Sequence, residues 1–110
     1  MDLPLIPGQD RRFTVVEYPS NAEVKKLARI MARDRRLNED QREVIADQYN
    51  VDTGEMLDGP KADRKAAEII FEEPIPSGIT GEDLSPRAVQ EATSVFMGVV
   101  TAQSDGQGGI

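Results

Sequence analysis

The sequence contains neither cysteine nor histidine among its 110 residues. Without cysteine, the chain can form no disulfide bond, no thiolate metal site and no cysteine nucleophile. Without histidine, it lacks the commonest general base and the commonest metal ligand of proteins. Any catalysis would therefore have to rest on carboxylates, lysine, serine, threonine or tyrosine.

Aromatic residues are also scarce, at 5% of the chain, and tryptophan is absent. A chain of 110 residues fits one small domain, so its core must be mostly aliphatic and of modest size. No apolar run approaches the length that spans a membrane, and the N-terminus lacks the basic start and apolar run of a signal peptide. We therefore expect no signal peptide, no transmembrane segment and no membrane partner.

Acidic charge is in excess, but it is distributed unevenly. The net charge is −7 at pH 7. Residues 23–36 nevertheless hold six basic and two acidic side chains, a net charge of +4, whereas residues 39–83 hold four basic and thirteen acidic ones, a net charge of −9. This asymmetry predicts that the two segments attract each other, within one chain or between copies.

Capping and periodicity signals predict a mainly α fold with three to four helices. Residues 20–23 form a capping box at the start of a first helix, and Asn38 is the predicted N-cap of a second helix. Pro60 fits the first position of a third helix. Ser85 and Pro86 mark the start of a fourth helix, because serine is a favoured N-cap and proline a favoured first residue.

Three further segments complete the prediction of secondary structure. The β-branched and aromatic residues at 12–18 predict a short N-terminal strand that ends at a proline. Residues 66–71 fit either the end of the third helix or a strand. Residues 73–81, rich in proline and glycine, are expected to be an extended connector.

The predicted organisation is one small domain with an extension at each end. Residues 1–12 contain two prolines and a glycine, and we interpret them as an extended N-terminal arm. Residues 13–103 form the single α-rich domain. Residues 104–110 are polar and glycine-rich, which predicts a flexible C-terminal tail.

The stretch NVDTGEM, residues 50–56, contains an Asp-Thr-Gly that resembles the active-site signature of retroviral-type aspartic proteases. The resemblance implies a dimeric peptidase in which two copies of Asp52 share a proton. That loop lies between strands in the protease family, whereas here it follows a long helical signal. We therefore interpret Asp52 and Gly54 as turn formers, with Gly54 supplying a positive φ.

Two other patterns overlap this stretch and fail on their chemistry. The spacing from Gly54 to Lys61 resembles a phosphate-binding P-loop, but Pro60 removes a backbone N–H where such loops need one. A calcium loop that starts at Asp52 would place Gly54 and Met56 at positions that need oxygen ligands, which leaves at most a weak adventitious cation site. We expect no catalytic residue, no cofactor, no metal site and no small-molecule substrate.

The candidate interaction residues form a basic helix face and a few apolar side chains. The basic face lies opposite the apolar stripe of the first helix. The net charge of −7 disfavours nucleic acid as its ligand, because it repels phosphate at long range. The interaction candidates are Lys25, Lys26, Arg29, Arg33, Arg36, Met56, Leu57 and Phe96.

Extended arms, a small core, a basic amphipathic helix in an acidic chain and no catalytic constellation occur together here. In length and style this combination resembles the small accessory proteins of tailed-phage particles, such as head–tail connector or completion proteins, capsid decoration proteins and tail accessory subunits. The resemblance implies a non-enzymatic structural or adaptor subunit of a virion or the host cytoplasm, with other protein subunits and copies of itself as partners. The alternative is a small acidic inhibitory or regulatory protein that mimics nucleic acid, and the third hypothesis is a nucleic-acid-binding helical hairpin.

Overall fold

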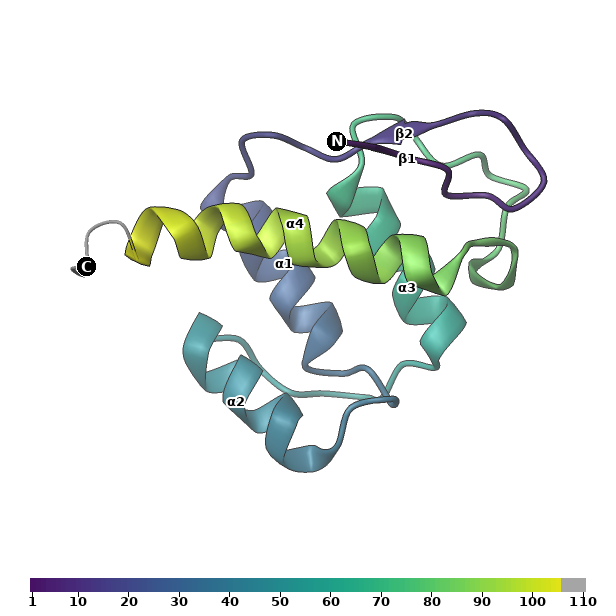
Figure 1. Cartoon of the computed structure of the whole chain (residues 1–110). Coiled ribbons are helices and arrows are strands. Elements are labelled where there is room, and N and C mark those ends of the chain that lie inside the picture. Colours follow the sequence, from purple (N-terminus) through teal and green to yellow (C-terminus); the bar gives the residue numbers. More distant parts are fainter. Residues whose placement is uncertain (106–110) are drawn as a thin grey trace.

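The computed structural model describes the backbone of residues 1–105 and the side chains of residues 1–98. Within that range the chain forms four α-helices and one two-stranded sheet, so the mainly α prediction with a short N-terminal strand is confirmed (Figure 1). The elements in chain order are β1 (Asp2–Leu3), β2 (Phe13–Thr14), α1 (Asn21–Met31), α2 (Glu39–Tyr49), α3 (Gly59–Ile70), the 3₁₀ turn η1 (Gly81–Asp83) and α4 (Pro86–Asp105).

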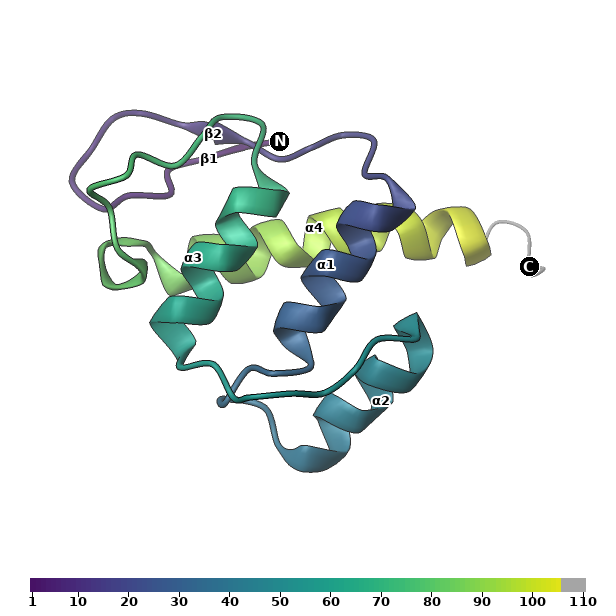
Figure 2. The same cartoon turned by 180° about the vertical axis from the view of Figure 1, so that it is seen from behind.

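The helices are arranged around a layer in which α1 and α3 lie side by side. Helix α4 crosses both of them on one side, and the β1–β2 pair lies at the C-terminal end of α3 (Figures 1 and 2). Helix α2 stands apart from α3 and α4 and packs against α1. Within residues 1–105, no helix is long and apolar enough to cross a membrane.

The starts of α1, α2 and α4 occur where the sequence predicts them, because caps satisfy their backbone groups locally. Helix α3 begins at Gly59, one residue before the predicted Pro60, and has no side-chain cap. At α1, the N–H of Glu23 donates to Ser20 Oγ at 3.1 Å, and the carboxylate of Glu23 accepts from the N–H of Ser20 at 3.0 Å. Asn38 and Gln41 form the same reciprocal pair at α2. At α4, Ser85 Oγ accepts from a backbone N–H of the first turn at 3.2 Å.

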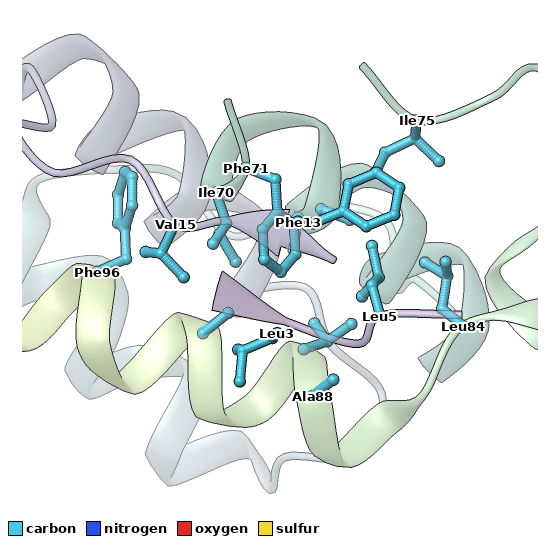
Figure 3. Packing of buried hydrophobic residues seen from close by; sticks show 14 of the residues in the cluster. Leu3, Leu5, Phe13, Val15, Ile70, Phe71, Ile75, Leu84, Ala88 and Phe96 are labelled. Atoms are coloured by element: carbon cyan, nitrogen blue, oxygen red, sulfur yellow. The ribbon is translucent and has the colours of Figure 1, made fainter. Parts of the chain in front are cut away.

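The main core lies between α1, α3, α4 and the β1–β2 pair (Figure 3). Its largest fully buried side chains come from all parts of the chain: Phe13, Phe96, Leu5, Leu27 and Ile70. The rings of Phe13 and Phe71 meet edge to face, with their centroids 5.9 Å apart. This core is aliphatic with three phenylalanines, as the scarcity of aromatic residues predicts.

The N-terminal segment, predicted to be an extended arm, packs into the core of its own domain. Leu3, Leu5 and Ile6 are buried in the chain's own core. Asp2–Leu3 pairs with Phe13–Thr14 in antiparallel register, and the carbonyl of Leu5 accepts the N–H of Ser85 at 2.8 Å. Because the domain is small and poor in aromatic residues, these aliphatic side chains supply core area that the helices alone do not.

The structure also settles the segments whose secondary structure the sequence leaves open. Helix α3 runs to Ile70, and the next residue, Phe71, forms an isolated antiparallel bridge with Val15. The predicted strand at 12–18 is therefore shorter than expected, since its regular pairing covers Phe13–Thr14. Helix α4 reaches Asp105, and the rest of the predicted tail, residues 106–110, lies outside the described residues.

The connector between α3 and α4 is held by two close contacts. A Cβ on Gly81 would lie 1.7 Å from the carbonyl oxygen of Pro60, so only glycine fits at this point of contact with the start of α3. Glu73 accepts the backbone N–H of Thr14, with distances of 2.7 Å and 3.1 Å to its two carboxylate oxygens. Partial burial acts to raise the pKa of Glu73, but hydrogen bonds from Thr14 and from its own backbone N–H outweigh it and lower the pKa.

We predict that Gly81→Ala destabilises the fold by about 1–3 kcal/mol, the usual cost of overpacking a close contact. The matched control is Gly78→Ala, because a Cβ at Gly78 has no neighbour within 4 Å. Urea unfolding followed by far-UV circular dichroism measures both free energies of unfolding. Equal midpoints for the two variants would contradict the close packing of the connector against α3.

Glu73→Gln is predicted to lower the free energy of unfolding at pH 7 by about 1 kcal/mol, because a charge-assisted hydrogen bond is weakened. The folded-state pKa of Glu73 lies below its ordinary value of 4.5, so its contribution is fully present above that pH and is lost as the pH falls through the folded-state pKa. Urea unfolding from pH 7 to pH 3 should therefore show the wild type and the variant converging in acid. Glu72→Gln, at an exposed neighbouring residue, should stay parallel to the wild type throughout.

Candidate functional site

Two connected depressions form an open groove on one face of the helices, and we call them together the docking groove. The first, of about 430 Å³, lies between α1, α3 and α4. The second, of about 390 Å³, lies between the end of α1 and α2. Both are lined by Met31 and Leu37, so one surface continues from α4 to α2.

Aliphatic and small side chains line most of this groove. Leu27 and Ile30 contribute from α1, and Ala66 contributes from α3. The α4 wall is uncharged and consists of Pro86, Val89, Gln90, Thr93 and Ser94. Small side chains on a wall let the backbone of another helix approach closely.

Helix α2 borders the second depression and presents an exposed aliphatic side chain. Val44 and Ile45 line the groove together with Asp40 and Gln41. Val44 is 61% exposed although it lies within a regular helix. A branched aliphatic residue that stands free beside an apolar groove gains the burial of its area only when a partner covers it.

A small cluster of its own holds α2 against α1. Ala28, Ala32, Ala46 and Val51 are buried together, and their small size brings the two helices close. Asn50 ends α2 in the left-handed region with a φ of 52°. The N–H of Val51 then donates to the carbonyl of Ala46 at 3.0 Å, so the chain turns back toward the end of α1.

Residues 32–38 connect α1 to α2, and we call them the joint. Residues 51–58, the return segment, follow α2 and pass beside this joint. The N–H of Leu57 donates to the carbonyl of Arg33 at 2.7 Å, and the N–H of Arg35 donates to the carbonyl of Leu57 at 2.9 Å. The role predicted for Gly54 is wrong, because the left-handed residue at this helix end is Asn50. A Cβ on Gly54 would lie 2.8 Å from the guanidinium carbon of Arg33, so this glycine gives the arginine room.

An ion cluster lies in the first depression, where the joint meets α3. Arg36 reaches both oxygens of Asp63, at 2.7 Å and 3.1 Å, and also donates to Asp34 at 2.7 Å. Asp63 is 4% exposed, although it is charged. Hydrogen bonds with Asp34, and then with Asp63, raise the pKa of Arg36, so the guanidinium stays charged. One cation between two carboxylates leaves the cluster with a formal charge of −1.

The structure divides the predicted basic face into two parts. Lys25, Lys26 and Arg29 are exposed on α1. Arg33 and Arg36 instead contact the return segment and α3 of their own chain. The positive charge of Arg36 therefore serves the attraction between basic and acidic segments that the composition predicts, through Asp63 of the same chain. Arg33 does not, because its buried Nε has no hydrogen-bond partner.

The predicted apolar interaction residues are also separated. Met56 is exposed on the return segment. Leu57 is half-buried, because its backbone pairs with the joint. The prediction for Phe96 is wrong: this side chain is fully buried in the main core, where the apolar stripe of α4 faces α1 and the β1–β2 pair.

The residues that shape the groove are not among those predicted from the sequence. Val44 follows the apolar periodicity of α2, yet its side chain is 61% exposed. The burial of Asp63 could have been predicted from the sequence, since this residue lies among Ala62, Ala66 and Ile70 on the apolar face of α3. A carboxylate at such a position needs a cation nearby, and Arg36 supplies it.

No protein-family model matches the chain, and neither the curated proteins nor the solved structures contain a match. In the part of the chain that the structure describes, no group of three or more acidic side chains is placed to hold a metal ion. Asp52, the residue of the protease-like signature, is exposed on the return segment after α2 rather than between strands.

Arg36→Met is predicted to lower the free energy of unfolding by about 2–3 kcal/mol, because it leaves the buried Asp63 unpaired. The matched control is Arg35→Met, which breaks a pair with Asp58 whose side chains are 64% and 73% exposed. Exposed pairs contribute little, so the control should lose less than about 1 kcal/mol. Replacing Asp63 by Leu together with Arg36→Met should recover part of the loss in the same urea measurement. Equal losses for Arg36→Met and Arg35→Met would contradict this role.

Proposed function

We propose that this protein is a non-enzymatic adaptor subunit that binds another protein through the docking groove. The observation that carries the proposal is the exposure of Val44, 61%, beside a groove that continues from α2 to α4. Exposed apolar surface with a polar rim is typical of protein–protein contacts. The site offers shape and apolar area, which suit recognition of a protein surface.

The path of the N-terminal segment supports the same function by removing an alternative surface. Leu3, Leu5 and Ile6 are buried in the chain's own core, so their apolar area is not available to a partner. Docking by an arm of residues 1–12 would require this core to open. The groove can accept a partner without any such loss of internal contacts.

The assembly that we propose is a tailed-phage particle, with the protein located in the virion or the host cytoplasm. The support is the resemblance in length and style to connector, decoration and tail accessory subunits. Copies of the chain are proposed as further partners, because the exposed Lys25, Lys26 and Arg29 on α1 are opposite in charge to exposed carboxylates outside the groove, such as Asp10, Glu17 and Glu72.

A second candidate function is supported by the acidic side chains along α2. Asp40, Glu43 and Asp47 are exposed and recur at spacings of three and four residues, which places them on one helix face. We call them the acidic row. In an inhibitor that mimics nucleic acid, such a row would occupy the basic groove of a target. That function depends on charge and gives Val44 no part.

The adaptor function predicts that the tagged wild-type chain, expressed in its native source, elutes in a complex of defined stoichiometry and high mass. Val44→Asp should reduce recovery of the complex by about tenfold, because a charge in the apolar contact costs more than about 1.4 kcal/mol. Tyr18→Ser is the matched control, since Tyr18 is 80% exposed and does not line the groove. Light scattering after size exclusion measures the masses.

A wild-type chain that elutes as a monomer with no partner would contradict the adaptor function. An unchanged recovery for Val44→Asp would do so as well. Loss of the complex on neutralising the acidic row, with Val44→Asp unaffected, would instead favour the inhibitor.

A further inference from the structure

The docking groove has the form of a site for a helix. Helices α3 and α4 border its first depression and α2 borders the second, and α1 contributes the partly exposed aliphatic side chains Ile30 and Met31. An amphipathic helix binds such a groove by inserting side chains that recur every three to four residues. On the α4 wall, Thr93 and Ser94 are short enough for a backbone to approach.

The charges beside the groove determine what else such a helix must carry. The acidic row, Asp40, Glu43 and Asp47, flanks Val44 on α2. Within the described residues, none of the three carboxylates has an ion pair with a basic side chain. The one basic residue of α2, Arg42, donates to the carbonyl of Leu37 instead.

This arrangement leaves repulsion that a ligand can relieve. Like charges three and four residues apart destabilise a helix, because their side chains lie on the same face. The ion cluster of Asp34, Arg36 and Asp63 adds a formal charge of −1 to the first depression. A cationic partner would be attracted along the whole length from α2 to the joint, and an acidic one would be repelled.

A second copy of this chain does not fit as the occupant. The helices that carry its exposed basic side chains are α1, α3 and α4, and the apolar stripe of each is buried in the core. These side chains are Lys25, Lys26 and Arg29 on α1, Lys61 and Lys65 on α3 and Arg87 on α4. The copy therefore cannot present basic and apolar side chains from one helix without unfolding. The occupant must be a different protein.

We propose that the docking groove binds an amphipathic helix of a different protein, with lysine or arginine residues along one edge of its apolar stripe. The apolar stripe covers Val44, Ile30 and Met31, and the basic edge lies against the acidic row. This proposal rests on the adaptor function and adds the chemistry of the partner.

The test uses the full chain and three synthetic helical peptides of about 18 residues, which make about five turns. The first has a leucine stripe with lysines on one edge, the second has the same stripe with glutamates, and the third is a scrambled version of the first. Isothermal titration calorimetry measures each affinity. The basic amphipathic peptide should bind at least tenfold more tightly than either of the others.

Two variants with matched charge separate the acidic row from net charge. Asp40→Asn, Glu43→Gln and Asp47→Asn together should remove most of the preference for the basic peptide. The control carries Asp10→Asn, Glu17→Gln and Glu72→Gln, three exposed carboxylates outside the groove, and should keep that preference. Val44→Asp should weaken binding of the first peptide by about tenfold, a loss of about 1.4 kcal/mol.

Far-UV circular dichroism confirms that each variant is folded. Equal affinities for the three peptides, no binding of any of them, or equal effects of the two triple variants would overturn the proposal. If the native complex still depends on Val44 in that case, the adaptor function stands and only the chemistry of the partner is wrong. If that complex is absent too, both proposals fail.

Discussion

The bridge from Arg36 to Asp34 and Asp63 is the interaction on which the rest of the arrangement depends. Asp63 lies on the buried face of α3, where an unpaired carboxylate would be costly. Arg36 neutralises it from the joint that follows α1, so the joint must pass close to α3. The contact with Asp34 fixes the arginine at its other side. One guanidinium therefore sets where α1 ends relative to α3, and hence where α2 begins.

The groove follows from that position. With the joint held against α3, α2 is attached to α1 through the small cluster of Ala28, Ala32, Ala46 and Val51 and through the return segment. In this position, Val44 and the acidic row of α2 remain exposed. The positive charge of Arg36 is paired inside the chain. Within the described residues, the carboxylates of the acidic row form no ion pair.

Local signals in the sequence predicted the helices, and non-local packing explains what they missed. The caps at Ser20, Asn38 and Ser85 act within one turn, so the sequence alone places these helix starts. The burial of the N-terminal segment depends on α4 and on the connector, which lie far away in the chain. The sequence places Phe96 on the apolar stripe of α4, but it does not indicate which surface covers that stripe. The candidate site was predicted least well, because Val44 and Asp63 acquire their roles from the joint between α1 and α2.

Amide hydrogen exchange in Arg36→Met tests most directly whether this bridge holds the groove together. In this variant we expect faster exchange at the amides of Arg35 and Leu57, which connect the joint to the return segment in the wild type, and throughout α2. The amides of α1, α3 and the first turns of α4 should lose only the protection that follows from the lower global stability of Arg36→Met, which is less than the loss in the joint and in α2. Unchanged exchange at Leu57 and in α2, or a uniform loss of protection over all four helices, would contradict the account.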